Sequence, residues 1–345
     1  MNNKLDELYA TVQVNQADLV AVTETWFSDS NPAEANEMKG YNLLHKDRAD
    51  KRGGGVALYA RNDLHATPFG AELTPKHLEI LWAKASLRSY VRNSVNLFTC
   101  VVYAPSNTPM KEEIIDHVIY MSDHIRNSFS DAAIVILGDF NDLDTTPFVR
   151  HLNVDQLVKQ PTRQNRILDM IFTDRGDFYK EPRITAPIGR SDHSTVLLFP
   201  EISRPTLTTR FSYRPMRDSG IRSFGRWITS YDFSYLNDME SPDDMVRSLQ
   251  NVLDQAYRQH FPLVVRKRSA NDKQWINDKI KTDIQKRQRA LERGDLASFR
   301  SIRNQIQRAI VKLKSTFYRS KIAGSDEELK SWLLAPSNTL SCWFE

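Results

Sequence analysis

The sequence predicts an α/β protein in which a large domain is followed by a basic helical region, and three observations support this fold class. Residues 134–137 form an unbroken apolar run, which is typical of a strand buried on both faces. Apolar residues recur at helical spacing through 114–125, directly before that strand. Charge is divided unevenly, because residues 1–200 carry 21 Lys and Arg against 26 Asp and Glu, whereas residues 201–345 carry 26 against 17.

Composition excludes several classes of protein. The 345 residues are 40% hydrophobic and 26% charged, which is typical of a globular chain. No apolar run reaches the roughly 18 residues that a membrane-spanning helix needs, and the N-terminus lacks the features of a signal peptide. The two cysteines, Cys100 and Cys342, provide no disulfide framework. We therefore expect a protein of the nucleus or cytoplasm that is not secreted.

Polar residues follow the central predicted strand. Gly138 frees the backbone after the apolar run, and Asp139 and Asn141 then point to the same side, because strand residues two apart share a face. Phe140 is expected to turn back into the core. An acid beside an amide can hold a phosphate, orient a water or ligate a hard metal. An Asx turn that closes the strand explains the same residues equally well.

Further strands are predicted before residue 200, and candidate functional residues lie at their ends. The predicted strands cover 18–23, 56–60, 78–87, 95–103, 167–172 and 195–199. Glu24 ends the first of them, where open α/β sheets place ligands, although a rim residue paired with an arginine fits equally well. Gly53, Gly54 and Gly55 are expected to form a hairpin turn or bulge, since no Gly-Lys-Ser/Thr of a phosphate-binding loop follows them.

Three more candidates come from the later strands. Tyr103 ends its strand with a phenol, which usually packs but can also donate to a phosphate oxygen. Asp169 lies inside an apolar run, and a buried charge is costly unless it is paired. His193 follows Asp192 at a strand entrance; a lone histidine is more often a satisfied loop residue, but here a buried aspartate needs a partner. We therefore predict a hydrogen bond between Asp169 and His193.

Taken in order, these patches resemble a known superfamily. They are ETW at 24–26, the arginine and triple-glycine pattern at 48–57, YAP at 103–105, GDFN at 138–141, QPTR at 160–163, LDMIFT at 168–173 and SDH at 191–193. Their order and spacing resemble the endonuclease/exonuclease/phosphatase superfamily, and within it the endonuclease module of non-LTR (LINE-type) retrotransposons. The resemblance covers roughly residues 1–200. It implies a deoxyribonuclease-I-like four-layer α/β/β/α sandwich, with two mostly antiparallel sheets flanked by helices.

The resemblance also implies an activity and a cofactor. The activity would be metal-dependent hydrolysis of phosphodiesters, nicking one strand of DNA, with Mg²⁺ or alternatively Mn²⁺ as the cofactor. Glu24 would ligate the metal, and Asp192 would assist the metal or the histidine. Mg²⁺ keeps several waters and needs only one or two carboxylates, so this small ligand set is expected.

The remaining candidates would act on the phosphate. By the same resemblance, His193 would act on the scissile phosphate or the attacking water, and Asp169 would orient its imidazole. Asp139 would activate the water or handle the leaving oxygen. Asn141 and Tyr103 would position the phosphate and neutralise its charge.

The start of the chain differs from the family pattern. Family members carry a first strand with an asparagine before the opening helix, whereas residues 1–4 lead directly into a helix here. We therefore expect the sheet to lack its first strand and both ends to be truncated, since no reverse-transcriptase pattern follows. Such a chain is expected to fold marginally and to nick DNA weakly.

The second part of the chain is predicted to be mostly helical. We expect an endonuclease-like domain at 1–200, a linker at 201–240, a basic helical region at 241–325 and an irregular C-terminus at 326–345. The stretch from 266 to 321 holds 17 basic and 5 acidic residues. Two explanations fit it: a helical hairpin with a solvated polar face, or a basic clamp for DNA, and also for RNA, whose affinity falls with salt.

Three functions are compatible with these features. The first is a Mg²⁺-dependent DNA endonuclease derived from a retrotransposon. The second is a catalytically weak or inactive nucleic-acid-binding remnant that keeps the fold and the basic tail. The third is a phosphatase or phosphodiesterase with a non-nucleic-acid substrate, which the basic tail and the ETW and QPTR patches disfavour. The target sequence and the oligomeric state do not follow from the sequence.

Overall fold

The computed structural model consists of two compact units. The first unit comprises Met1–Arg204 with Asn271–Glu345, and the second comprises Pro205–Ala270. The residues that the structure describes are 4–27, 36–48, 53–86, 96–201, 209–268, 273 and 275–323. The predicted irregular C-terminus at 326–345, together with Cys342, lies outside these residues.

The larger sheet of the first unit has six strands, and its central strand is the one predicted from the apolar run. Its strands are, in spatial order, β4 (Thr67–Pro68), β5 (Ile80–Ser86), β6 (Asn96–Tyr103), β7 (Ala132–Asp139), β9 (Asp169–Thr173) and β8 (Asp155–Gln156). Only β6 and β7 are parallel, and helix α2 (Lys111–Ser128) provides the crossover that a parallel pair requires.

The second sheet has three antiparallel strands, in the order β1 (Leu19–Thr23), β3 (Val56–Arg61) and β2 (Tyr41–Lys46). β2 and β3 form the hairpin that the triple glycine predicts. A separate antiparallel pair, β10 (Arg183–Thr185) and β11 (Thr195–Leu197), follows later in the chain. Short 3-10 helices at Asn62–Leu64 and Gly176–Phe178 complete the connections.

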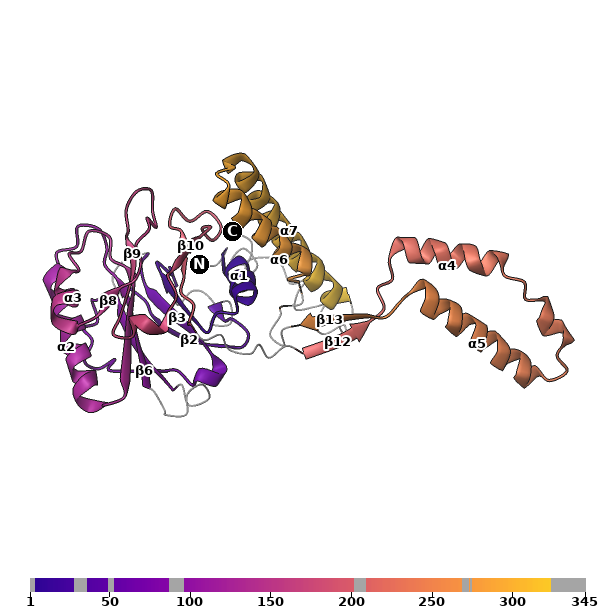
Figure 1. Cartoon of the computed structure of the whole chain (residues 1–345), viewed down its shortest axis with the longest axis horizontal. Coiled ribbons are helices and arrows are strands. Elements are labelled where there is room, and N and C mark those ends of the chain that lie inside the picture. Colours follow the sequence, from indigo (N-terminus) through magenta and orange to yellow (C-terminus); the bar gives the residue numbers. More distant parts are fainter. Residues whose placement is uncertain are drawn as a thin grey trace, which may run out of the picture. The chain divides into compact units, whose positions relative to one another are not determined.

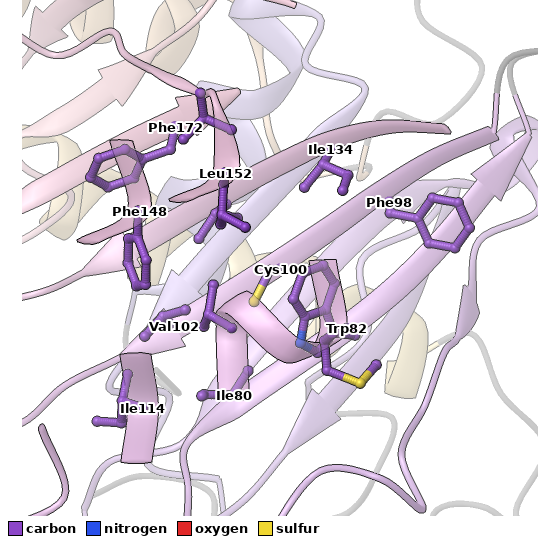
Figure 2. Close-up of a cluster of buried hydrophobic side chains, with 14 of the residues drawn as sticks. Ile80, Trp82, Phe98, Cys100, Val102, Ile114, Ile134, Phe148, Leu152 and Phe172 are labelled. Atoms are coloured by element: carbon purple, nitrogen blue, oxygen red, sulfur yellow. The ribbon is translucent and has the colours of Figure 1, made fainter. Parts of the chain in front are cut away.

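Three separate apolar cores define the layers of the first unit. α2 and α3 (Thr146–Leu152) cover one face of the six-stranded sheet, around Trp82, Phe98 and Phe148 (Figure 2). A second core lies between the two sheets and includes Leu58 and Val101. A third core covers the outer face of the three-stranded sheet. The fold is thus the expected four-layer α/β/β/α sandwich.

The third core is built by helices from opposite ends of the chain. α1 (Leu5–Asn15) packs with α6 (Asp278–Glu292) and α7 (Leu296–Ala323) against the outer face of β3, and Figure 1 shows the three helices together. Tyr9, Tyr59, Ile280 and Ile306 are almost completely buried there. α6 and α7 therefore form a layer of the first unit, whereas the sequence places them in a separate tail at 241–325.

The second unit is an antiparallel ribbon that carries two helices. It comprises β12 (Thr209–Tyr213), α4 (Asp218–Ser230), a 3-10 helix (Ser234–Asp238), α5 (Pro242–His260) and β13 (Val264–Arg268). Aromatic side chains hold α4 to the end of α5, because Phe224 contacts both His260 and Phe261. The expected linker at 201–240 thus contains a strand and a helix.

Some expectations about the ends of the chain concern residues that the structure leaves undescribed. Residues 1–3, and Arg52 of the arginine and triple-glycine pattern, are among them. Within the described part of the chain, no strand precedes α1. No helix of that part combines the length and the apolarity that crossing a membrane requires.

Gly138 is a position where the fold tolerates only glycine. Its φ is +149°, and an added Cβ would lie 1.8 Å from the carbonyl oxygen of Val102 on β6. We predict that Gly138→Ala lowers the free energy of unfolding by about 2–4 kcal/mol. Urea unfolding followed by circular dichroism measures this loss.

Gly225→Ala is the matched control, because an added Cβ in the middle of α4 meets nothing within 4 Å. It should stabilise the chain by about 0.5–1 kcal/mol through helix propensity. A wild-type unfolding midpoint for Gly138→Ala would contradict the close approach of β6 and β7.

Candidate active site

Strand pairing brings three of the predicted residues to one end of the six-stranded sheet. Asp139, the last residue of β7, lies opposite Asp169, the first residue of β9. Tyr103, the last residue of β6, lies beside Asp139 on the other side. Because these residues end or begin adjacent strands, their backbones are placed by ladder hydrogen bonds and need no loop to position them.

The predicted contact between Asp169 and His193 is present. Nδ1 of His193 lies 2.9 Å from Oδ2 of Asp169, and both side chains are about four-fifths buried. This hydrogen bond raises the pKa of His193, and burial opposes it only in part. Nδ1 therefore carries the proton that the carboxylate accepts, which leaves Nε2 to meet a substrate.

Thr162 joins the strand of Asp169 to the loop of His193. Its buried hydroxyl accepts hydrogen bonds from the backbone N–H groups of Leu168 (3.1 Å) and Asp169 (3.0 Å), and its carbonyl accepts one from Ser194 N–H (2.7 Å). The sequence gives no role to Thr162, although it belongs to the QPTR patch. Its position in that patch, six residues before Leu168, is the only signal that points to it.

Asp139 is the most buried acid of the site. The residue is 3% exposed, and burial, followed by the negative charge of Asp169, raises its pKa to about 6. Asn141 N–H donates to Asp139 Oδ1 at 3.2 Å. Ligand atoms of Asp139, Asp169 and His193 all lie within 4.8 Å of one another. These three residues can hold a metal ion or act together on one substrate.

The side-chain amide of Asn141 holds the backbone at the end of β7 in place. Its Nδ2 donates to the carbonyl of Ala104 at 3.0 Å, and its Oδ1 accepts from Ser106 Oγ at 3.1 Å. Its φ is +45°, in the left-handed region that Asn tolerates better than most residues. The turn that closes β7 and a place beside Asp139 at the edge of the sheet are therefore compatible explanations of this residue.

Tyr103 connects Glu24 to the rest of the site. Its hydroxyl donates to Glu24 Oε1 at 2.5 Å. Burial, then the hydrogen bond and the charge of Glu24, and then the charge of Asp139 raise the pKa of Tyr103, so the phenol stays protonated. Within the described residues, neither Glu24 nor Asp139 forms an ion pair with a lysine or arginine. The carboxylates around Tyr103 thus leave negative charge that a cation can neutralise.

Arg48 and Glu79 form a support that the sequence does not identify. Arg48 Nε lies 2.9 Å from Glu79 Oε1, and the backbone N–H of Gly55 donates to the other carboxylate oxygen. The guanidinium also lies over the ring of Tyr103, 5.8 Å from its centroid. An added Cβ on Gly54 would meet Glu79 at 2.4 Å, which explains a glycine there. Glu79 belongs to none of the patches, so only the structure reveals it.

Two predicted metal residues stand apart from the carboxylate–histidine group. Asp192 is 66% exposed and forms an ion pair of 2.5 Å with Arg163. Its charge contributes to the raised pKa of His193, after those of Asp169 and Asp139. Glu24 reaches the group through Tyr103. Among the described residues, the group close enough to share an ion therefore contains neither of them.

The arrangement suits hydrolysis of an anionic ester. A carboxylate with a pKa near neutrality can accept a proton from water, and a histidine with a raised pKa can donate to an oxygen that gains negative charge. The phenol of Tyr103 and the amide of Asn141 add neutral polar groups to the same edge of the sheet.

Comparison with known proteins gives one family match. The profile of the Endonuclease/Exonuclease/phosphatase family matches residues 1–193, which is more than half of the chain. None of the curated proteins compared with the chain matches it.

Several solved structures are similar to a little over half of the chain. The AP endonuclease from Leishmania major is 16% identical, with 56% of this chain and 82% of that one covered and a TM-score of 0.45. D. rerio TDP2, complexed with a single-strand DNA product, is 16% identical over 56% and 90% of the two chains, with a TM-score of 0.39. An endonuclease/exonuclease/phosphatase from Bacteroides vulgatus is 15% identical over 58% and 91%, with a TM-score of 0.43.

Because its pKa is raised, replacing the Asp139 carboxyl by a neutral amide should stabilise the protein at high pH. Because the folded-state pKa of about 6 lies above the ordinary value of 3.8, Asp139 favours folding only while it is protonated. This contribution is complete below pH 3.8 and is lost as the pH rises through 6. Asp139→Asn should therefore raise the free energy of unfolding by about 1–3 kcal/mol at pH 8 without metal.

Urea unfolding in EDTA at pH 8 and at pH 4 measures this difference. Asp144→Asn is the control, since Asp144 lies on the surface and the hydrogen bonds from Thr146 lower its pKa. That variant should lose a little stability at pH 8. Equal stability of Asp139→Asn and wild type at both pH values would contradict the costly burial of this carboxylate.

Proposed function

Because this chain belongs to the endonuclease/exonuclease/phosphatase family, we propose that it is a Mg²⁺-dependent DNA endonuclease that hydrolyses phosphodiester bonds and nicks one strand. The observation that carries the proposal is the Asp139–Asp169–His193 group, in which a carboxylate of raised pKa lies beside a carboxylate-oriented histidine. Proteins of this family act on phosphodiesters, and this group can supply both proton transfers that such a reaction needs.

In the proposed reaction, each residue acts at a stated atom. Asp139 accepts a proton from the water that attacks phosphorus, and the raised pKa of about 6 suits that transfer near neutral pH. His193, held by Asp169, donates from Nε2 to a phosphate oxygen as its charge grows. Asn141 binds a further phosphate oxygen through the second N–H of its Nδ2, and Tyr103 binds another by turning its single O–H from Glu24 to the phosphate. The P–O bond to the leaving oxygen breaks, that oxygen takes up the proton that His193 donated, and one strand is nicked.

Oxygen donors for a divalent cation are available beside these residues. Glu24 would hold Mg²⁺, or Mn²⁺, beside Tyr103, since its carboxylate has no lysine or arginine partner among the described residues and Mg²⁺ needs only one or two carboxylates. When bound, the cation would offset the negative charge of the phosphate. Asp169 stays with His193 in this assignment, and Asp192 stays with Arg163.

The retrotransposon origin and the DNA substrate are parts of the same proposal. The order of the ETW, GDFN, QPTR and SDH patches supports the origin. The exposed basic residues of α6 and α7 support a polyanionic partner, and location in the nucleus or cytoplasm fits both. RNA would be an additional ligand of the same basic face.

Removal of the catalytic histidine tests the proposed activity. We predict that His193→Ala lowers the rate of nicking of supercoiled plasmid in Mg²⁺ by about 10²–10⁴. EDTA should abolish nicking by the wild-type chain. His151→Ala, which removes an exposed histidine from α3, is the control and should nick at the wild-type rate.

Other outcomes would favour the other functions. Plasmid binding without nicking in Mg²⁺ or Mn²⁺, from a folded chain, would favour a nucleic-acid-binding remnant. Hydrolysis of phosphomonoesters or lipid phosphodiesters in preference to plasmid, with the same loss in His193→Ala, would favour a phosphatase or phosphodiesterase.

The basic face of α7 generates a separate prediction. Arg300, Arg308 and Lys312 are exposed while the apolar side of the helix is buried. Replacing all three by Gln should weaken duplex DNA binding and lower the slope of log K against log salt by about 2–3, because fewer counterions are released. Fluorescence anisotropy between 50 and 200 mM salt, about the range where such slopes are large, measures it.

The control removes the same charge from other surfaces of the first unit. Lys76, Lys159 and Lys180 are exposed and lie outside the hairpin, so their replacement by Gln should leave the slope close to that of wild type. Identical slopes for the two triple variants would leave α7 as a helix with an ordinary solvated face.

A further inference from the structure

We infer that the α6–α7 hairpin positions His193, and that Glu7, Arg287 and Gln288 are positioning residues of the active site. The inference rests on the proposed hydrolytic role of His193. The hairpin lies outside the residues that the family profile matches, which end at 193. It would therefore be a support for the active site that this chain builds from a later segment.

The element that the hairpin holds is the loop between β10 and β11. Its two ends are fixed by the pairing of Thr185 with Thr195, and the loop of 186–194 carries His193 near its second end. Toward its first end lie Ala186, which is 4% exposed, and Gly189. An added Cβ on Gly189 would come within 3.5 Å of both Lys4 and Gln307, so this part of the loop lies against α1 and α7.

Glu7 of α1 joins the loop to α6 by one carboxylate oxygen. Its Oε1 accepts a hydrogen bond from the backbone N–H of Gly189 at 3.1 Å and pairs with Nη1 of Arg287. Both side chains of the ion pair are almost fully buried, at 3% and 2% exposure. A buried pair of this kind adds little net stability compared with apolar residues, but it selects one register of the packed elements.

Gln288, the next residue of α6, holds the loop at a second point. Its Oε1 accepts from the backbone N–H of Ala186 at 2.8 Å. Ala186 also packs in a small apolar cluster with Ala290 and Phe299 of the hairpin. Two backbone N–H groups of one short loop are thus bound by side chains of α1 and α6.

The opposite side of the loop is held by the active site itself. Ser194 N–H donates to the carbonyl of Thr162, and the imidazole of His193 lies against Asp169. The loop is therefore fixed from both sides, with His193 between them. Releasing the hairpin side leaves the imidazole attached only through its own catalytic contacts, so its orientation toward a substrate is no longer fixed.

A pair of double variants isolates the Gly189 hydrogen bond from the ion pair. Both variants carry Arg287→Met; the first combines it with Glu7→Leu and the second with Glu7→Gln. Both lose the buried charges and keep similar side-chain volumes, so the loss of the ion pair is common to them. Only the Glu7→Gln variant keeps an oxygen that can accept from Gly189 N–H.

We expect the Leu variant to lose about 10- to 100-fold in kcat relative to the Gln variant, with KM within about twofold, since substrate binding does not use the loop contact. Amide hydrogen exchange of the 186–194 peptide, measured by mass spectrometry, should be faster in the Leu variant. Exchange in α2 should be equal in the two variants, which shows that both remain folded.

Gln288 provides an independent arm. Gln288→Met should lower kcat and accelerate exchange of the same peptide, and Gln288→Glu, which keeps the acceptor oxygen, should restore both. Gln285→Met, at an exposed position of the same helix, and Glu292→Ala, which removes the other hydrogen-bond partner of Gln288, are controls and should behave as wild type.

Two equalities together would overturn the inference. The Leu and Gln double variants would have the same exchange of the 186–194 peptide and the same kcat, and Gln288→Met would match wild type in both measurements. The exchange measurement does not depend on hydrolysis. If the wild-type chain and His193→Ala both fail to hydrolyse phosphodiesters, the proposed function fails, and loop exchange alone then decides whether the hairpin holds the loop.

Discussion

The structure depends on the pairing of β7 with β6 on one side and β9 on the other. This single strand aligns Tyr103, Asp139 and Asp169 at one edge of the sheet, and its two faces contribute to two different cores. The alignment requires β6 to approach so closely at Gly138 that the carbonyl of Val102 occupies the place of a side chain. Packing and site geometry therefore share one constraint: the register that buries the apolar run also sets the spacing of the acids.

The electrostatics of the site oppose stability and support chemistry. Asp139 is buried beside a second carboxylate, so its ionised form is disfavoured, and no lysine or arginine among the described residues relieves it. His193 supplies part of the compensation, and its own pKa rises because Asp169 accepts its proton. Acids and bases whose environments move their pKa values toward neutrality are typical of active sites. The buried Asp139 and the exposed Glu24 both lie near the protonated Tyr103, and their negative charge favours a divalent cation.

The third apolar core shows that the basic helices α6 and α7 are part of the first unit. Their isoleucines cover the three-stranded sheet together with α1, so their basic side chains lie on a layer of the domain and not on a separate appendage. The two explanations of this region, a helical hairpin with a solvated face and a basic clamp, are therefore compatible. The hairpin supplies packing on one face and positive charge on the other. Removing it to test DNA binding would also expose the third core, release Ala186 and leave Glu7 without Arg287, which is why substitution of surface charges is the cleaner experiment.

The sequence by itself determined the α/β class, the strands β1, β3, β5, β6, β7, β9 and β11, the hairpin at the triple glycine and the contact between Asp169 and His193. Apolar periodicity and glycine are local signals. A charged residue inside an apolar run, such as Asp169, also predicts a partner, because a buried charge is costly unless it is paired. Tertiary structure alone decided that Asp192 pairs with Arg163, that Glu79 supports the glycine turn, and that Glu7 meets Arg287 across 280 residues of chain. It also decided that 276–323 belongs to the first unit while 205–270 does not. Those contacts join segments far apart in the chain. A local sequence pattern predicts an amphipathic helix but not the distant surface against which the helix packs.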